Sequence, residues 1–217
     1  MKAKEITKRY ILFVISLFFI AVGVAFTKRS ALGVSPISSV ANMLSLKFTF
    51  LSMGNWLLVW NCILIAGQIV VLRIRFQLYQ LLQLPLSILF GYFTDLAMTM
   101  ISGIPITAYL SQLVMLIGGG VVLGVGVSLS VIANVIMNSA EAFVKAVSDV
   151  TDINFGNIKV AFDVACVIIS VSLSIVFFNG KIVETREGTL IAAVCTGFVV
   201  KFFCRLLKQP LERMLVR

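Results

Sequence analysis

Six long apolar runs constrain the fold of this 217-residue chain more than any other feature. Each has about the length that a helix needs to cross the hydrocarbon core of a bilayer. Lipid offers the backbone no hydrogen-bond partners, so such runs must be helical. Apolar residues make up 60% of the chain and charged residues 12%, which is too little polar surface for a soluble domain. We therefore predict an all-α membrane protein of about six transmembrane helices, forming one membrane domain over residues 1–217. The runs cover residues 10–27, 53–72, 78–101, 107–136, 157–178 and 188–207.

The chain also repeats a pattern. Gly54-Asn55 opens the second run, and Gly156-Asn157 opens the fifth run 102 residues later. At the same offset, Asn61 aligns with Asp163. This spacing predicts that the chain consists of two related halves.

The halves are residues 10–101 and residues 107–207, and each contains three predicted spans. An odd number of spans makes the second half enter the membrane from the opposite face. The duplication is therefore predicted to be an inverted repeat, an arrangement that often builds a transport site between its halves.

Positive charges predict the orientation of the spans. With six spans, the basic groups before the first span, between the second and third spans, and in the tail all lie on one side of the membrane. The positive-inside rule then places both termini in the cytoplasm. The net charge of +9 fits this topology and an attraction to anionic lipid, and it does not indicate nucleic acid. The groups are Lys2, Lys4, Lys8 and Arg9; Arg73 and Arg75; and Lys208, Arg213 and Arg217.

A segment too short to span follows the first run. Gly33 breaks a helix, Ser35 can cap a new one, and Pro36 suits its first turn. A helix of about a dozen residues follows, with Ser38 and Ser39 near its start. We expect a short interrupted or re-entrant helix here.

The second half has a counterpart after its first span. Asn138 or Ser139 would cap this short helix, and Glu141 would lie in its first turn, where the helix dipole favours a carboxylate. The N-terminal N–H groups of two such helices attract anions. The alternative is that both helices lie on the membrane surface. Glu141, Lys145 and Asp149 favour it for the second segment, whereas residues 31–46 carry no charge.

Polar residues within the spans are candidates for a site because their desolvation is costly. Asn61 and Asp163 form the leading pair for a substrate or proton site. Lys159 lies one turn before Asp163 and offers a purely structural alternative, an ion pair. The predicted substrate-binding residues are Ser35, Ser38, Ser39, Asn61, Asn138, Ser139, Glu141 and Asp163.

Other polar and small residues within the spans have simpler explanations. Gln68 and Gln83 can bridge helices without any substrate. Lys201 can extend its ammonium to the cytoplasmic surface. The glycines of residues 118–126 allow close helix packing, with an unwound point in the fourth span as the alternative.

The chain contains no histidine, which excludes a histidine-ligated metal or an imidazole base. We expect no catalytic residue, no metal and no cofactor, and hence no enzyme.

Two motifs resemble a known family. Residues 31–38, ALGVSPIS, resemble the "lG.sP" segment of the YczE/YyaS/YitT group of bacterial integral membrane proteins. Residues 188–202 resemble the "GT-l-x-a-l-x-x-G" last span of that group, and the segment from Gly91-Tyr92 to Asp95 also fits. The resemblance implies a small, multi-pass protein of the bacterial inner membrane without an established substrate. The chain departs from the pattern at Lys201, where an acidic or neutral residue is expected.

Three functions fit these features. The first is a transporter or permease that moves a small, perhaps anionic solute by alternating access. The second is a substrate-capture subunit of a multi-component transporter, and the third is a membrane accessory protein that transports nothing. The expected partners are membrane lipid and a small-molecule solute but no nucleic acid. Association into a homo-oligomer stays open, because lipid-facing and partner-facing surfaces look alike in sequence.

Overall fold

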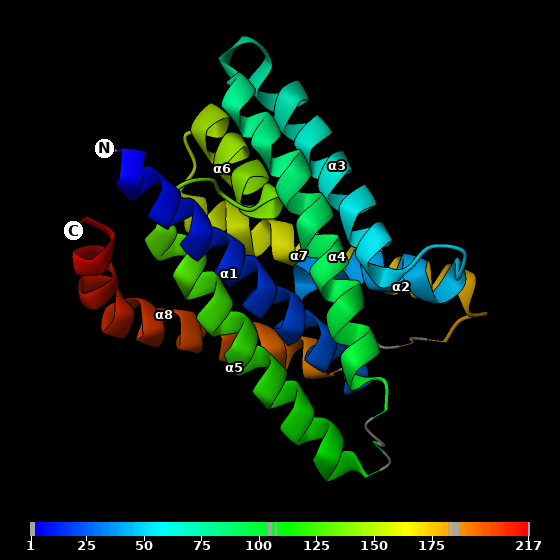
Figure 1. Ribbon diagram of the computed structural model, residues 1–217. Coiled ribbons are helices and arrows are strands. Elements are labelled where there is room, and N and C mark those ends of the chain that lie inside the picture. The colour runs from blue at the N-terminus through cyan, green and yellow to red at the C-terminus, as the bar shows by residue number, and fades with distance from the viewer. Residues whose placement is uncertain (1–2, 104–105, 107, 182, 184–186, 217) are drawn as a thin grey trace. The chain divides into compact units, whose positions relative to one another are not determined.

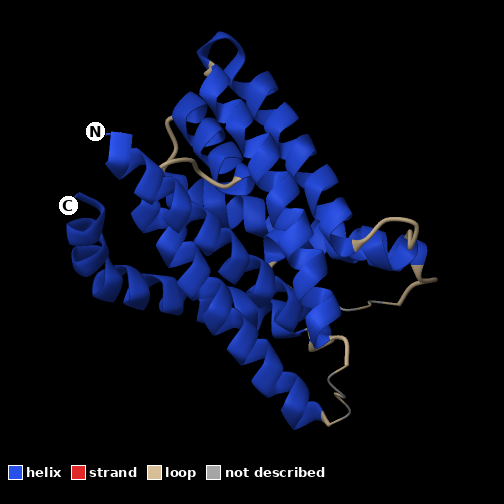
Figure 2. Cartoon of the chain, in the orientation of Figure 1, coloured by secondary structure: helices blue, strands red, loops and turns tan. Residues whose placement is uncertain are grey.

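The computed structural model describes residues 3–103, 106, 108–181, 183 and 187–216, with side chains for all of these except 3, 4, 187, 190–195 and 216. Every regular element in these residues is a helix (Figure 2). In chain order the elements are α1 (Ala3–Arg29), α2 (Pro36–Lys47), α3 (Met53–Leu72), η1 (Arg73–Arg75), η2 (Leu78–Leu82), α4 (Gln83–Ile101), α5 (Tyr109–Ala133), α6 (Ser139–Thr151), α7 (Phe155–Phe177) and α8 (Glu187–Val216).

The predicted spans coincide with the long helices. Five stretches of the described chain are long and apolar enough to cross a membrane, and they contain α1, α3, α4, α5 and α7. The sixth predicted run, 188–207, falls within α8, where several side chains lie outside the described residues. The prediction of an all-α membrane protein is confirmed.

The helices form two compact units, and each unit takes segments from both predicted halves. Unit 1 contains α1, the end of α4, α5 and α8. Unit 2 contains α2, α3, the start of α4, α6 and α7. In residue numbers, unit 1 is 1–35, 93–135 and 186–217, and unit 2 is 36–92 and 136–185.

In unit 1, α1 and α5 lie side by side along most of their length (Figure 1). Glycines of α5 make this approach possible. A Cβ atom added at Gly119 would lie 2.9 Å from the backbone N of Thr27, and one added at Gly126 would lie 2.7 Å from the backbone N of Ile20. Small residues let helix backbones pack this closely in membranes. The predicted packing role is confirmed for Gly119 and Gly126, and α5 runs without a break, so the unwound alternative is wrong.

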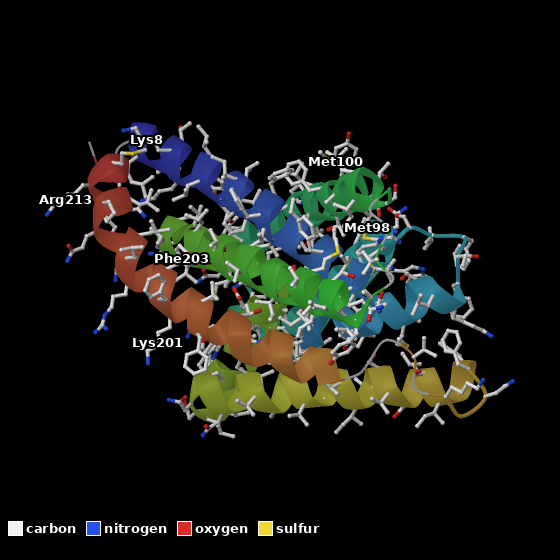
Figure 3. The ribbon with its side chains drawn as sticks, turned by 90° about the horizontal axis from the view of Figure 1, so that it is seen from below. Lys8, Met98, Met100, Lys201, Phe203 and Arg213 are labelled. Atoms are coloured by element: carbon white, nitrogen blue, oxygen red, sulfur yellow. The ribbon has the colours of Figure 1, made fainter. Side chains whose placement is uncertain are left out.

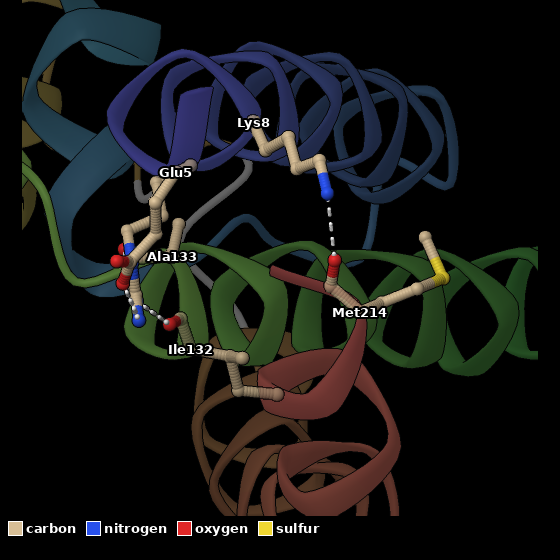
Figure 4. A network of polar contacts seen from close by, with 6 residues as sticks. Glu5, Lys8, Ile132, Ala133 and Met214 are labelled. Atoms are coloured by element: carbon tan, nitrogen blue, oxygen red, sulfur yellow. Dashed lines mark hydrogen bonds and ion pairs between the residues drawn. The ribbon is translucent and has the colours of Figure 1, made fainter. Parts of the chain in front are cut away.

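Two basic residues tie the beginning of α1 to other parts of unit 1. Lys8 Nζ donates to the backbone O of Met214, 3.1 Å away, near the end of α8 (Figure 4). Arg9 donates to the carbonyls of Ile132 and Ala133 at 3.4 and 3.2 Å, so its positive charge lies at the C-terminus of α5, where the helix dipole favours it. Arg9 also pairs with Glu5. The start of α1 and the end of α8 therefore lie at the same end of unit 1.

The end of α8 turns away from the rest of that helix (Figures 1 and 3). Pro210 lies inside α8, where its ring removes a backbone N–H and clashes with the preceding turn. This proline accounts for the bend.

In unit 2, both short helices pack against long ones. α2 and α6 each contact α3 and α7. The start of α4 approaches the start of α3 closely, because a Cβ atom at Gly91 would lie only 2.7 Å from the carbonyl O of Gly54. Unit 2 holds seven of the eight predicted site residues, and Ser35 is the last residue of its stretch of unit 1.

Candidate functional site

The two predicted interruptions are present. The chain is non-helical between α1 and α2, where Gly33 has a φ of 148°, and α2 begins at Pro36, directly after Ser35. α5 ends at Asn134, which adopts the left-handed conformation, and α6 begins directly after Asn138. The Asn138 side chain caps α6 by accepting from the backbone N of Ser139 at 3.0 Å. The predicted starts of both short helices are confirmed.

In unit 2, α2 buries its first two turns against its neighbours. Ser38, Ser39 and Asn42 have exposed fractions of 3% or less. Ser39 donates to the carbonyl of Pro36 within its own turn, at 2.6 Å. Its own carbonyl accepts from the hydroxyl of Ser170, which lies on α7, at 3.2 Å. A helix of the second half therefore holds the short helix of the first half.

α6 is held in the reverse way, by helices of the first half. Gln68 of α3 and Gln83 of α4 exchange two amide hydrogen bonds of 3.1 Å, and Gln68 also donates to the carbonyl of Ser139 at 3.1 Å. The Ser139 hydroxyl lies 3.3 Å from the hydroxyl of Ser87 on α4. All four side chains are buried. Helices of the first half therefore hold the short helix of the second half, and the predicted helix-bridging role of the two glutamines is confirmed.

The two hydrogen bonds fit the predicted repeat in part. Gln68 and Ser170 are 102 residues apart, the same offset that separates Gly54 from Gly156. Each donates to a carbonyl in the first turn of the short helix from the opposite predicted half. The donors differ in chemistry, and their acceptors Ser139 and Ser39 are 100 residues apart.

The segment before α2 has its own contact in unit 1. A Cβ atom at Gly33 would lie 2.5 Å from the backbone N of Thr189, and one at Gly188 would lie 2.5 Å from the carbonyl O of Leu32. Thr189 is buried. The "lG.sP" and "GT" motifs, more than 150 residues apart in sequence, therefore touch (188 − 33 = 155). Their small residues have a packing reason that the sequence alone does not reveal.

Charges gather where α6 meets α7. Lys159 and Asp163 form an ion pair along α7, which is the structural alternative for Asp163. Glu141 on α6 interacts electrostatically with both. Burial raises the pKa of Glu141, Lys159 opposes this effect and Asp163 adds to it. The Lys159–Asp163 pair therefore lies near enough for its charges to act on Glu141.

The structure brings together some of the predicted site residues and separates others. The start of α6 brings together its cap Asn138 with Ser139 and Glu141. The charge of Asp163 on α7 acts on Glu141. Asn61 is buried on α3, and within the described part of the chain it forms no hydrogen bond with Asp163. The binding role of the eight residues stays a prediction.

Two participants, Ser87 and Ser170, are not predicted from sequence, and Thr189 is identified only as part of the "GT" motif. A serine in an apolar helix gives no signal by itself. For Ser170, the offset of 102 residues from Gln68 could have supplied one.

Among the described residues, no group of three or more histidine, cysteine, aspartate or glutamate side chains lies close enough to hold a metal ion. The arrangement offers helix N-termini, serine hydroxyls and amides, which can bind an anionic ligand, beside the carboxyl groups of Glu141 and Asp163.

Comparison with known proteins gives a family and no function. No curated protein and no solved structure matches the chain. The model of a family of unknown function, DUF6198, matches residues 7–205, and the chain therefore belongs to that family.

Proposed function

We propose that this membrane protein is a transporter or permease of the bacterial inner membrane, moving a small anionic solute by alternating access. The reciprocal exchange in unit 2 carries the proposal: each short helix is held by long helices of the opposite half. Transporters with inverted repeats build their sites from such interrupted helices. The resemblance to the YczE/YyaS/YitT group adds the bacterial inner membrane, and the positive-inside rule adds that both termini lie in the cytoplasm.

In this mechanism the first turns of α2 and α6 bind the solute. The N-terminal ends of these two helices favour negative charge, and Ser38 and Ser139 add hydroxyls. Glu141 or Asp163 carries a coupling proton, and the ion pair with Lys159 changes when that proton binds. No chemical transformation of the solute is assigned.

One observation favours a second function. The Gln68–Gln83 amide pair is satisfied within the protein, and Asp163 has its partner in Lys159. Polar groups paired in this way also suit an accessory protein that transports nothing, in which they only hold helices together.

Cysteine accessibility separates the two functions. In a cysteine-free background, Ser38→Cys and Ser139→Cys are labelled with a membrane-impermeant thiol reagent from each face of oriented vesicles. Alternating access predicts that each position reacts from both faces, whereas exposed Ser111→Cys, a control at the start of α5, reacts from one. Labelling of both positions from one face only would overturn the transporter proposal and favour the accessory protein.

Flux into proteoliposomes then tests coupling. Uptake of inorganic phosphate, sulfate and small carboxylates is measured with an inward proton gradient. Glu141→Gln is expected to reduce a saturable flux at least about tenfold, since a proton carrier contributes through its charge. Exposed Asp149→Asn, which breaks only the surface pair with Lys145, is the matched control and should leave the flux unchanged.

A further inference from the structure

The exposed side of α8 carries two neighbouring stripes. Phe198, Phe202 and Leu206 recur every four residues and have exposed fractions of 73%, 61% and 57%. A second stripe, defined as the basic stripe, consists of Lys201, Arg205 and Lys208, all exposed. At about 100° per residue, both stripes fall on the same face of the helix, next to each other.

The opposite face of α8 packs against α5. A Cβ atom at Gly124 would lie 2.6 Å from Cγ1 of Val199, and the Cys204 thiol lies 3.9 Å from the carbonyl O of Ser128. Figure 3 shows Lys201 and Arg213 extending away from the helix axis. The two stripes therefore belong to the face of α8 that unit 1 leaves uncovered.

No carboxylate neutralises the basic stripe within the described residues. The ion pairs found there lie on α1, α6 and α7. Glu212 follows Lys208 by four residues on α8, yet the two form no ion pair. The stripe thus presents uncompensated positive charge.

The predicted position of α8 in the membrane brings the three cations of the basic stripe to a similar depth. The last apolar run ends near residue 207, so Lys201 lies about 9 Å inside that end, at about 1.5 Å per residue. A lysine side chain can extend its ammonium over most of this distance to the interface. Arg205 and Lys208 flank the end itself. The three charges therefore meet at the level of the lipid phosphates, while the phenylalanines lie beside the acyl chains.

We infer that this face of α8 binds a phospholipid with a negatively charged head group, in the leaflet where both termini lie. Arginine matches phosphate geometry with two parallel hydrogen bonds, and lysine adds charge. The apolar stripe distinguishes a lipid from a soluble anion, because only a lipid brings acyl chains to lie along it. This inference does not depend on transport.

The test compares two double variants of the full-length protein. Arg205→Gln/Lys208→Gln removes two charges from the basic stripe. Arg73→Gln/Arg75→Gln removes two exposed charges from η1, which is predicted to face the same side of the membrane. Phosphatidylglycerol and phosphatidylcholine with identical chains are offered in mixed micelles, and the retained lipid is counted by native mass spectrometry.

The wild-type protein is expected to prefer phosphatidylglycerol. Each cation near anionic lipid contributes about 1 kcal/mol, so the α8 variant should lose about tenfold or more of that preference. The η1 variant should lose much less. An equal loss in both variants, or no preference in the wild type, would overturn the inference. Equally effective competition by inorganic phosphate would also overturn it, since the ligand would then be a soluble anion. Thermal unfolding in phosphatidylcholine alone confirms that each variant is folded.

Discussion

The two short helices are held in different ways, although the predicted repeat makes them counterparts. α6 is tied to α3 and α4 by a buried network of two glutamines and two serines. α2 is tied to α7 by hydrogen bonds that join Ser39 to Ser170 and to Cys166, and the segment before α2 packs against the start of α8 by close backbone contact.

The difference follows from composition. Residues 31–46 carry no charge, and seven residues of α2 are buried. α6 has one buried face and one charged face, with Lys145 and Asp149 paired at the surface. A helix with a charged face needs directional bonds to fix its orientation, whereas an uncharged helix such as α2 can rely more on close packing.

The largest expected effect comes from breaking the shape-based contact. Gly33→Ala places a Cβ atom against the backbone of Thr189 at a φ of 148°, where side chains are strained. We expect a loss of about 2–4 kcal/mol in the free energy of unfolding, because a clash with backbone cannot relax by rotation of a side chain. The measurement is thermal unfolding in detergent.

Gly118→Ala is the matched control for that substitution. A Cβ atom at Gly118 would meet nothing within 4 Å, so its stability should stay level or rise slightly. If Gly33→Ala were as stable as this control, the close contact with α8 would not hold the segment.

Breaking the network around α6 should lower the free energy of unfolding by less than Gly33→Ala does. Gln68→Leu leaves the amide of Gln83 and the carbonyl of Ser139 without their partner, at a cost of about 1–3 kcal/mol. A double-mutant cycle with Gln83→Leu should show a coupling of about 1 kcal/mol, since the first substitution already removes the shared bonds. Exposed Gln77→Leu is the control. Additive effects of the two glutamine substitutions would contradict the network.

The smallest effect is expected at the repeat partner of Gln68. Ser170→Ala removes one hydrogen bond to Ser39 and should cost about 0.6 kcal/mol, the average for such bonds between membrane helices. Exposed Ser172→Ala on the same helix should cost nothing measurable. If Ser170→Ala and Gln68→Leu lowered the free energy of unfolding equally, the two short helices would be held alike. That result would contradict the difference described above.

Much of the fold could be predicted from sequence. The apolar run 53–72 matches α3 residue for residue, and 78–101 matches η2 together with α4. Gly33, Pro36 and Asn138 predicted where the short helices begin. These features act locally: an apolar run of sufficient length must be helical in lipid, and glycine, proline and capping residues act within one turn.

The candidate site could be predicted less completely. Its residues on α6 were identified because a carboxylate and a cap leave a local signal. Sequence alone does not decide whether Asp163 pairs with Lys159 or forms a site with Asn61, because the pattern supports both. The structure shows the pair with Lys159. Ser87 and Ser170 are not predicted, since an isolated hydroxyl in an apolar helix has many uses.

The sequence by itself determined the class of protein, the long helices and the two interruptions between them. Hydrophobicity and helix-breaking residues specify these over short stretches of chain. Only the tertiary structure decided that α7 holds α2 and that α3 and α4 hold α6. Such pairings join residues such as Ser39 and Ser170, 131 positions apart. They depend on how small residues let particular helices approach each other, and local sequence does not encode that three-dimensional fit.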